Sequence, residues 1–91
     1  MKKSDLIATV AAKAKITNKA AEDVVNIIFQ TMKHALIRGE RIELRGLGSF
    51  SVKKYGAYVG RNPKTGGQIN VKEKRLPVFK TGKDLQRRIN S

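Results

Sequence analysis

Seven lysine and arginine side chains and one proline occur within residues 53–75, where large apolar residues are few. The stretch alternates as a β ribbon does, but it has too few large apolar side chains for a core position. Cations spaced along such a ribbon can ion-pair with the phosphates on both sides of a nucleic-acid groove. The candidate phosphate-binding residues of the ribbon are Lys53, Lys54, Arg61, Lys64, Lys72, Lys74 and Arg75.

The proline lies in the segment Asn62–Gly67, whose composition is typical of a turn. One interpretation is that Pro63 is an ordinary turn residue with a fixed φ and no N–H donor. Its neighbours Arg61, Asn62 and Lys64 favour a second interpretation, in which groove-reaching polar groups flank an apolar ring. Minor-groove proteins insert such wedges between base steps and kink the duplex. We therefore expect Pro63 to be a wedge at the tip of a DNA-binding arm.

The arm is predicted as a β-hairpin over about residues 55–74. With about seven residues on each side at roughly 3.3 Å per residue, it would be on the order of 20–25 Å long. A two-stranded ribbon of this kind is only marginally stable by itself in water. We expect it to become ordered on its partner.

The charge of the chain is uneven as well as high. Twenty basic and seven acidic residues give a net charge of +13. Residues 1–40 carry seven basic and four acidic groups, a net of +3, whereas residues 41–91 carry thirteen and three, a net of +10. Such asymmetry indicates a polyanionic partner, with nucleic acid ahead of an anionic membrane surface.

Double-stranded DNA is the preferred partner among the nucleic acids. RNA binding is a secondary alternative, because the ribbon has only Tyr55 and Tyr58 and therefore no aromatic platform of the kind that RNA-recognition sheets use. A basic structural protein that binds other proteins through its helices is a third alternative. It predicts that DNA affinity does not depend on Pro63 or on residues 61–67.

Two helices are predicted in the first forty residues. Ser4 is the expected N-cap of the first, which ends near Ala14, and Thr17 is the expected N-cap of the second, which stops at Gly39. The second helix is apolar over most of its circumference, so it must be covered on more than one side. A second copy of the chain is the simplest cover in a protein of 91 residues, and a well-buried helix in a monomer is the alternative.

The second half of the chain changes to strand periodicity. Residues 41–45 and 49–59 alternate and are joined by the tight connection Gly46–Gly48, and residues 68–72 and 76–79 return. Thr81 and Asp84 have the spacing of a capping box and are expected to open a short last helix. The predicted fold is α+β in a single domain, residues 1–91, with a helical dimerisation part over 1–40 and the sheet, arm and last helix over 41–91.

Catalysis is not expected. The chain has no cysteine, its single histidine, His34, fits a surface position, and no two carboxylates are placed to converge for acid–base chemistry. No glycine-rich segment has the spacing of a phosphate-binding loop. We expect no enzyme activity, no cofactor and no metal. No apolar run is long enough for a membrane span, and lysines interrupt any export signal, so a cytoplasmic protein without a membrane partner is expected.

Three segments together resemble a known family: Gly39–Phe50, Gly60–Gly66 and Pro77–Leu85. Their residues and order closely resemble the HU and integration host factor family of bacterial DNA-bending proteins, and the resemblance extends over essentially the whole chain. It implies an intertwined dimer with a helical base, a β-sheet saddle and two arms that embrace DNA through the minor groove, located in the nucleoid.

The resemblance also implies roles for individual residues. Pro63 would be the intercalating residue, with Arg61 and Asn62 beside it in the groove. The residues that would hold the DNA backbone at the flanks of the body are Arg45, Lys80, Lys83 and Arg87.

The chain departs from many relatives in the segment Tyr55–Val59, which is less basic. Arm contacts near the body are therefore expected to be weaker or partly aromatic, and Gln86 is not assigned a phosphate. Within the family, HU-like binding with little sequence preference is favoured over site-specific binding of the kind made by the beta subunit of integration host factor. Glu43 and Arg45 resemble DNA-contacting residues of that subunit, or are simply outward-facing strand residues. A homodimer is expected, with a heterodimer with a paralogue as the alternative.

Overall fold

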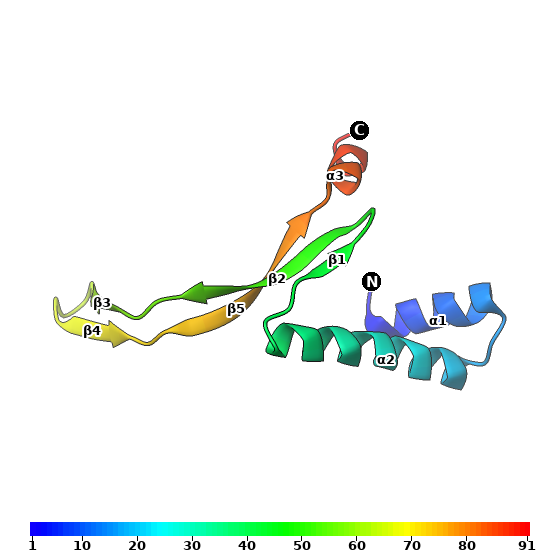
Figure 1. Ribbon diagram of the computed structural model, residues 1–91, viewed down its shortest axis with the longest axis horizontal. Helices are drawn as coiled ribbons and strands as arrows, with labels where there is room; N and C mark the ends of the chain where they lie inside the picture. Colours follow the sequence, from blue (N-terminus) through cyan, green and yellow to red (C-terminus); the bar gives the residue numbers. More distant parts are fainter.

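The computed structural model describes all residues, 1–91, as three helices and five strands (Figure 1). In chain order they are α1 (Lys3–Ala14), α2 (Asn18–Ile37), β1 (Ile42–Leu44), β2 (Gly48–Tyr55), β3 (Tyr58–Arg61), β4 (Gln68–Val71), β5 (Lys74–Thr81) and α3 (Lys83–Ile89). Helices α1 and α2 lie side by side, α3 stands at the other end of the sheet, and a long ribbon projects away from both (Figure 1). The expected α+β fold with two N-terminal helices, a hairpin sheet and a short C-terminal helix is confirmed.

Helix α1 has its N-cap two residues earlier than predicted. Ser4 was expected to be the N-cap, but it is the second residue of the helix and Lys2 occupies the cap position. The reason is that Asp5 reaches back and accepts a hydrogen bond from the backbone N–H of Lys2 at 2.7 Å. The Asp5 carboxylate therefore satisfies an N–H at the helix start without help from the serine.

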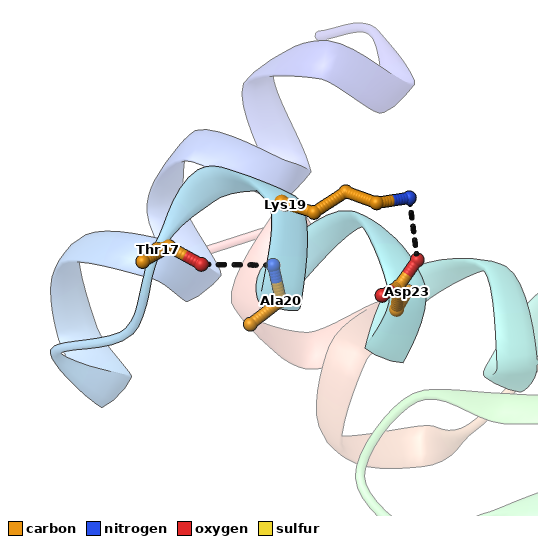
Figure 2. Close-up of polar contacts among 4 residues, drawn as sticks. All are labelled: Thr17, Lys19, Ala20 and Asp23. Atoms are coloured by element: carbon orange, nitrogen blue, oxygen red, sulfur yellow. Dashed lines mark hydrogen bonds and ion pairs between the residues drawn. The ribbon is translucent and has the colours of Figure 1, made fainter.

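Helix α2 begins and ends where its sequence predicts. The hydroxyl of Thr17 accepts a hydrogen bond from the N–H of Ala20 at 3.1 Å, and Lys19 pairs with Asp23 at 3.1 Å one turn further on (Figure 2). The hydrogen bond and charge of Asp23 raise the pKa of Lys19 above its usual value. At the other end Gly39 has a φ of 80°, a conformation that favours glycine, and it stops the helix.

The helix is followed by an exposed ion pair. Arg38 and Glu40 are 2.9 Å apart, and the hydrogen bond and charge of Arg38 lower the pKa of Glu40. Since both groups are solvated, we treat this pair as a minor contributor to stability.

The main sheet has three antiparallel strands in the order β1-β2-β5. Ile42 lies opposite Phe50, and Phe50 lies opposite Phe79, with the two rings 4.8 Å apart. These three residues share one face of the sheet, which carries both of its phenylalanine rings. The predicted hairpin through Gly46–Gly48 is therefore present, with β5 added along its second strand.

The arm is divided into two separately paired parts, which its sequence does not predict. Strands β3 and β4 form a separate two-stranded sheet. Between this sheet and the main sheet, residues 56–57 on one side of the ribbon and 72–73 on the other belong to no strand. The register is unchanged across this interruption, because Tyr55 lies opposite Lys74 and Tyr58 lies opposite Val71. Two residues are thus unpaired on each side of the ribbon. The prediction of a continuous hairpin over residues 55–74 is wrong in this respect. Gly56 explains part of the break, since glycine weakens strand pairing.

The expected cap of the last helix is also wrong. Thr81 is the last residue of β5, opposite Gly48, and Gly82 is the N-cap of α3 without a side-chain hydrogen bond. The backbone of Thr81 belongs to the sheet, so its hydroxyl is not placed to cap the helix. Asp84 instead pairs with Arg88 at 3.3 Å.

Very little of the chain is buried. Only Ala11, Ala21 and Val25 are shielded from solvent, whereas Ile27 and Ile28 on α2 are 65% and 51% exposed. The radius of gyration is 19.1 Å, against about 12 Å for a compact domain of this length. The single chain therefore leaves much of its apolar helix surface, including Ile27 and Ile28, uncovered.

No helix has the length and apolar character needed to cross a membrane. No group of three or more histidine, cysteine, aspartate or glutamate side chains is placed to hold a metal ion.

Candidate nucleic-acid interface

Four cations gather at the end of the sheet beside α3. They line an open depression of about 580 Å³ together with the Gly46–Gly48 turn, Ser49 and Thr81. We call them the body cluster: Arg41, Arg45, Lys80 and Lys83. Three of the four were predicted from the resemblance. Arg41 was missed, although its alternation with Ile42 in the strand was a signal that it points away from the apolar face.

Backbone contacts hold the body cluster together. Ser49 lies opposite Lys80 in the sheet, and the N–H of Gly82 donates to the carbonyl of Leu47 at 3.0 Å, which fixes the start of α3 against the turn. Gly48 has a φ of 152°, and a Cβ at this position would overlap the carbonyl oxygen of Lys80. The absence of a side chain at Gly48 therefore lets the turn and β5 approach closely enough to bring these cations together.

One acid, Glu43, lines the same depression as the body cluster. Glu43 pairs with Arg41 at 3.1 Å, and Arg41 also donates to the hydroxyl of Ser49 at 3.4 Å. These contacts orient Arg41 along the strand. Since both partners of the ion pair are more than half exposed, a phosphate can compete with the carboxylate for the guanidinium.

Arg87 lies one turn further along α3. With Lys83, Gln86 and Asn90 it lines a second depression of about 530 Å³. Its nearest acid is Asp84, at 3.7 Å. The structure therefore places Arg87 as an extension of the body cluster through Lys83, and Gln86 lies beside it.

The cations of β2 and β5 are divided between two faces of the sheet. Residues opposite one another in an antiparallel pair share a face, and faces alternate along each strand. Lys53, Lys74 and Lys80 consequently share one face. Lys54 and Arg75 lie opposite each other on the other face, the one that carries Phe50 and Phe79.

Arg75 and Lys54 have partners within the chain. Arg75 lies next to Gly39 at the end of α2, with a guanidinium nitrogen 3.1 Å from where a Cβ of that residue would be. Lys54 pairs with Glu73 at 2.9 Å across the interruption of the ribbon. These two predicted residues are thus not brought together with the body cluster, and their contact with DNA stays a prediction.

The tip of the arm is a closed six-residue turn. The N–H of Asn62 donates to the carbonyl of Gly67 at 2.8 Å, and the side-chain oxygen of Asn62 accepts from the N–H of Lys64 at 2.9 Å. This leaves Pro63 exposed at the end of the hairpin, between exposed Arg61 and Lys64. Asn62 is half-buried, and its side-chain oxygen is occupied by the hydrogen bond from Lys64 within the turn.

The structure has a helical pair at one end and an isolated projecting hairpin (Figure 1). The sheet is cationic and the hairpin is basic with an exposed proline at its tip. Together these features define a class of nucleic-acid-binding protein with a projecting arm. A sequence model of the family described as bacterial DNA-binding protein matches residues 1–90. The chain belongs to this family.

Solved structures agree with this assignment. The chain is similar to HU in the Anabaena HU–DNA cocrystal structure, with 35% identity, a TM-score of 0.84, and coverage of 98% of this chain and 97% of that one. It is similar to a mutant of HU from Thermotoga maritima, with 30% identity, a TM-score of 0.71, and coverage of 98% and 99%. A mutant of transcription factor 1, at 19% identity and a TM-score of 0.67 over 99% of this chain and 91% of that one, shares the fold.

The resemblance to HU drawn from the three sequence segments is confirmed, and the chain is an architectural DNA-binding protein. The contacts that individual residues make with DNA follow from neither the family nor the fold.

Proposed function

We propose that this protein bends and compacts double-stranded DNA as a dimer, with its arms in the minor groove and Pro63 as the intercalating wedge. The observation that carries the proposal is the exposure of Pro63 at the end of a basic hairpin that pairs with no other strand of the chain. A proline that served only the turn would not need cations on both sides of it. An apolar ring between Arg61 and Lys64 suits insertion at a base step, with phosphates held on either side.

The body cluster has a separate role in this proposal. Arg45, Lys80 and Lys83, joined by Arg41 and extended by Arg87, would hold the DNA backbone on each flank of the dimer. Because the molecule is 60 Å long, the body and the arm tip would contact positions that are far apart on the duplex. Bending would bring both into contact at once, so that the additional contacts offset the cost of deforming the DNA.

The exposed apolar surface of α2 supports the dimer. Val24, Ile27 and Ile28 are all more than two-fifths exposed in the single chain, which is unusual for successive isoleucine and valine side chains on a helix. A second copy would cover them and complete the core, with residues 1–40 as the dimerisation part of a single domain. We infer a homodimer, because the same surface on two copies can be self-complementary.

The experiment that tests the wedge is a bending assay on a duplex of about 30 base pairs labelled for energy transfer at both ends. Pro63→Ala should lower the bend angle more than it lowers affinity, because the cations that supply most of the affinity are untouched. Lys64→Gln is the matched control at the adjacent position: it should weaken binding and retain the bend. Bending that is unchanged in Pro63→Ala would show that the wedge is wrong.

Little sequence preference is expected. The pairing of Glu43 with Arg41 supports a structural role for the acid, in contrast to one in base recognition. Selection from a random duplex library should therefore enrich flexible steps without a fixed sequence. Recovery of one conserved site would favour the site-specific alternative, and competition by double-stranded RNA as strong as by DNA would favour RNA binding.

We further infer a non-enzymatic role in the nucleoid. The supporting observation is the DNA-binding family itself, whose architectural members act by contact and deformation.

A further inference from the structure

The β3–β4 hairpin has two chemically different faces. Tyr58 lies opposite Val71 and Gly60 lies opposite Ile69, so these four positions share one face. The pairs on the other face are Val59 with Asn70 and Arg61 with Gln68. One face is therefore aromatic and aliphatic without a charge, and the other carries Val59 together with an arginine and two amides.

The Tyr58 face is uncovered. Tyr58 is 61% exposed and Ile69 is 43% exposed, and neither strand of the hairpin pairs with the main sheet. The ring of Tyr58 leans over Gly60, since its Cε2 atom is 3.5 Å from where a Cβ of that glycine would be. The glycine leaves the ring free to lie along the ribbon towards the tip, and the phenol oxygen has no hydrogen-bond partner among the side-chain contacts of the arm.

The surroundings of this face indicate what covers it. Residues 53–75 contain seven cations and one acid, a net charge of +6. Such a ribbon is repelled by a second copy of itself and attracted to a polyanion. In a minor groove each face of an inserted ribbon meets a wall of deoxyribose, whose carbon–hydrogen surface is apolar and adjoins the phosphates.

We propose that the two faces of the hairpin bind the walls of the groove by different chemistry. Tyr58, with Ile69 beside it, packs on the deoxyribose of one wall, whereas Arg61 ion-pairs with phosphate on the other. This proposal rests on the proposed function, because it requires the arm to lie in the groove. It assigns to Tyr58 a DNA contact that contributes affinity without neutralising a phosphate.

The salt dependence of binding separates the two chemistries. Each phosphate neutralised contributes about −0.9 to the slope of log affinity against log salt. Removing Arg61 should therefore make the slope shallower by about one unit. Removing the Tyr58 ring should lower affinity by about tenfold at every salt concentration and leave the slope unchanged, because only apolar area is lost.

The test is a salt titration with a random-sequence duplex of about 30 base pairs, using wild type, Tyr58→Ala, Tyr58→Phe and Arg61→Ala. Tyr58→Phe keeps the ring and should bind within about twofold of wild type, since the contact is apolar. Tyr58→Thr tests whether the hairpin is simply weakened: threonine is a good strand former without a ring. Binding by Tyr58→Thr should be as weak as by Tyr58→Ala.

Three outcomes would overturn the proposal: wild-type affinity in Tyr58→Ala, recovery of affinity in Tyr58→Thr, or a shallower slope in Tyr58→Ala. A change in the mass of the free Tyr58→Ala protein would assign this face to a contact between subunits and would also overturn it. Failure of the proposed function looks different. In that case Arg61→Ala and Pro63→Ala would also leave DNA binding and bending unchanged.

Discussion

At the scale of single residues, Gly48 controls the geometry of the body cluster. A methyl group there would meet the carbonyl oxygen of Lys80 and the ring of Phe79, and the φ of 152° is unfavourable for any other residue. Gly48→Ala should lower the free energy of unfolding by about 2–3 kcal/mol, measured by urea denaturation. Gly56→Ala is the matched control, because nothing lies within 4 Å of its Cβ position. Equal stability of the two variants would contradict the close approach of Gly48 to the carbonyl oxygen of Lys80.

Individual residues also show where sequence reasoning succeeds. The N-cap role of Thr17 was predicted correctly, because the hydroxyl of a threonine just before a helix accepts a hydrogen bond from an N–H of the first turn. Ser4 and Thr81 were predicted incorrectly as helix caps. At the start of α1 the carboxylate of Asp5 accepts the hydrogen bond from the N–H of Lys2, and Thr81 is paired with Gly48 in the sheet. Arg75 carried the same charge signal as Lys74, and alternation along β5 puts the two on opposite faces. Only the register shows that Arg75 shares its face with Lys54 and Phe79.

At the scale of elements, the arm contains one carboxylate. Glu73 lies at the interruption of the ribbon and pairs with Lys54 at 2.9 Å. Glu73→Gln should tighten DNA binding by about threefold at moderate salt and steepen the salt slope, because Lys54 becomes available to a phosphate. The affinity is measured by fluorescence anisotropy. Glu22→Gln, on the helical pair, removes the same charge and should have no effect.

Unchanged or weaker binding by Glu73→Gln would mean that Lys54 does not reach the DNA. That result would agree with its position beside Arg75 on the face that carries Phe50 and Phe79.

The elements themselves were largely predictable, but the division of the arm was not. Alternation of residue types identifies strands, and glycine with proline identifies the tip. Pairing is a relation between two segments, however, and nothing within Gly56–Ala57 or Lys72–Glu73 alone indicates that both lose their partners together. The two faces of the hairpin likewise became known only with the register.

At the scale of the whole molecule, the single chain lacks a core of its own. If α2 is covered by a second copy, the melting temperature should rise with protein concentration, because association stabilises the folded state. Ile27→Lys should lower the melting temperature and yield a monomer by mass measurement, since it introduces a charge into the covered surface. Ile89→Lys is the matched control on α3, where the exposed fraction is similar, 70% against 65%.

A wild-type melting temperature that does not depend on concentration would contradict the dimer. So would an Ile27→Lys variant as stable as Ile89→Lys, because an isoleucine that is solvated in the final assembly can be replaced at little cost, within about 0.5 kcal/mol.

The unpaired residues between the two sheets of the ribbon separate two properties of the arm. Since the register is the same on either side, the number of residues from the body to Pro63 is fixed on both strands, and so is the reach of the tip. The direction of the tip depends instead on residues 56–57 and 72–73, which have no ladder hydrogen bonds to resist bending. On DNA of varying shape, the spacing of the kinks in base pairs would therefore stay constant while the angle between the duplex arms adapts to the sequence.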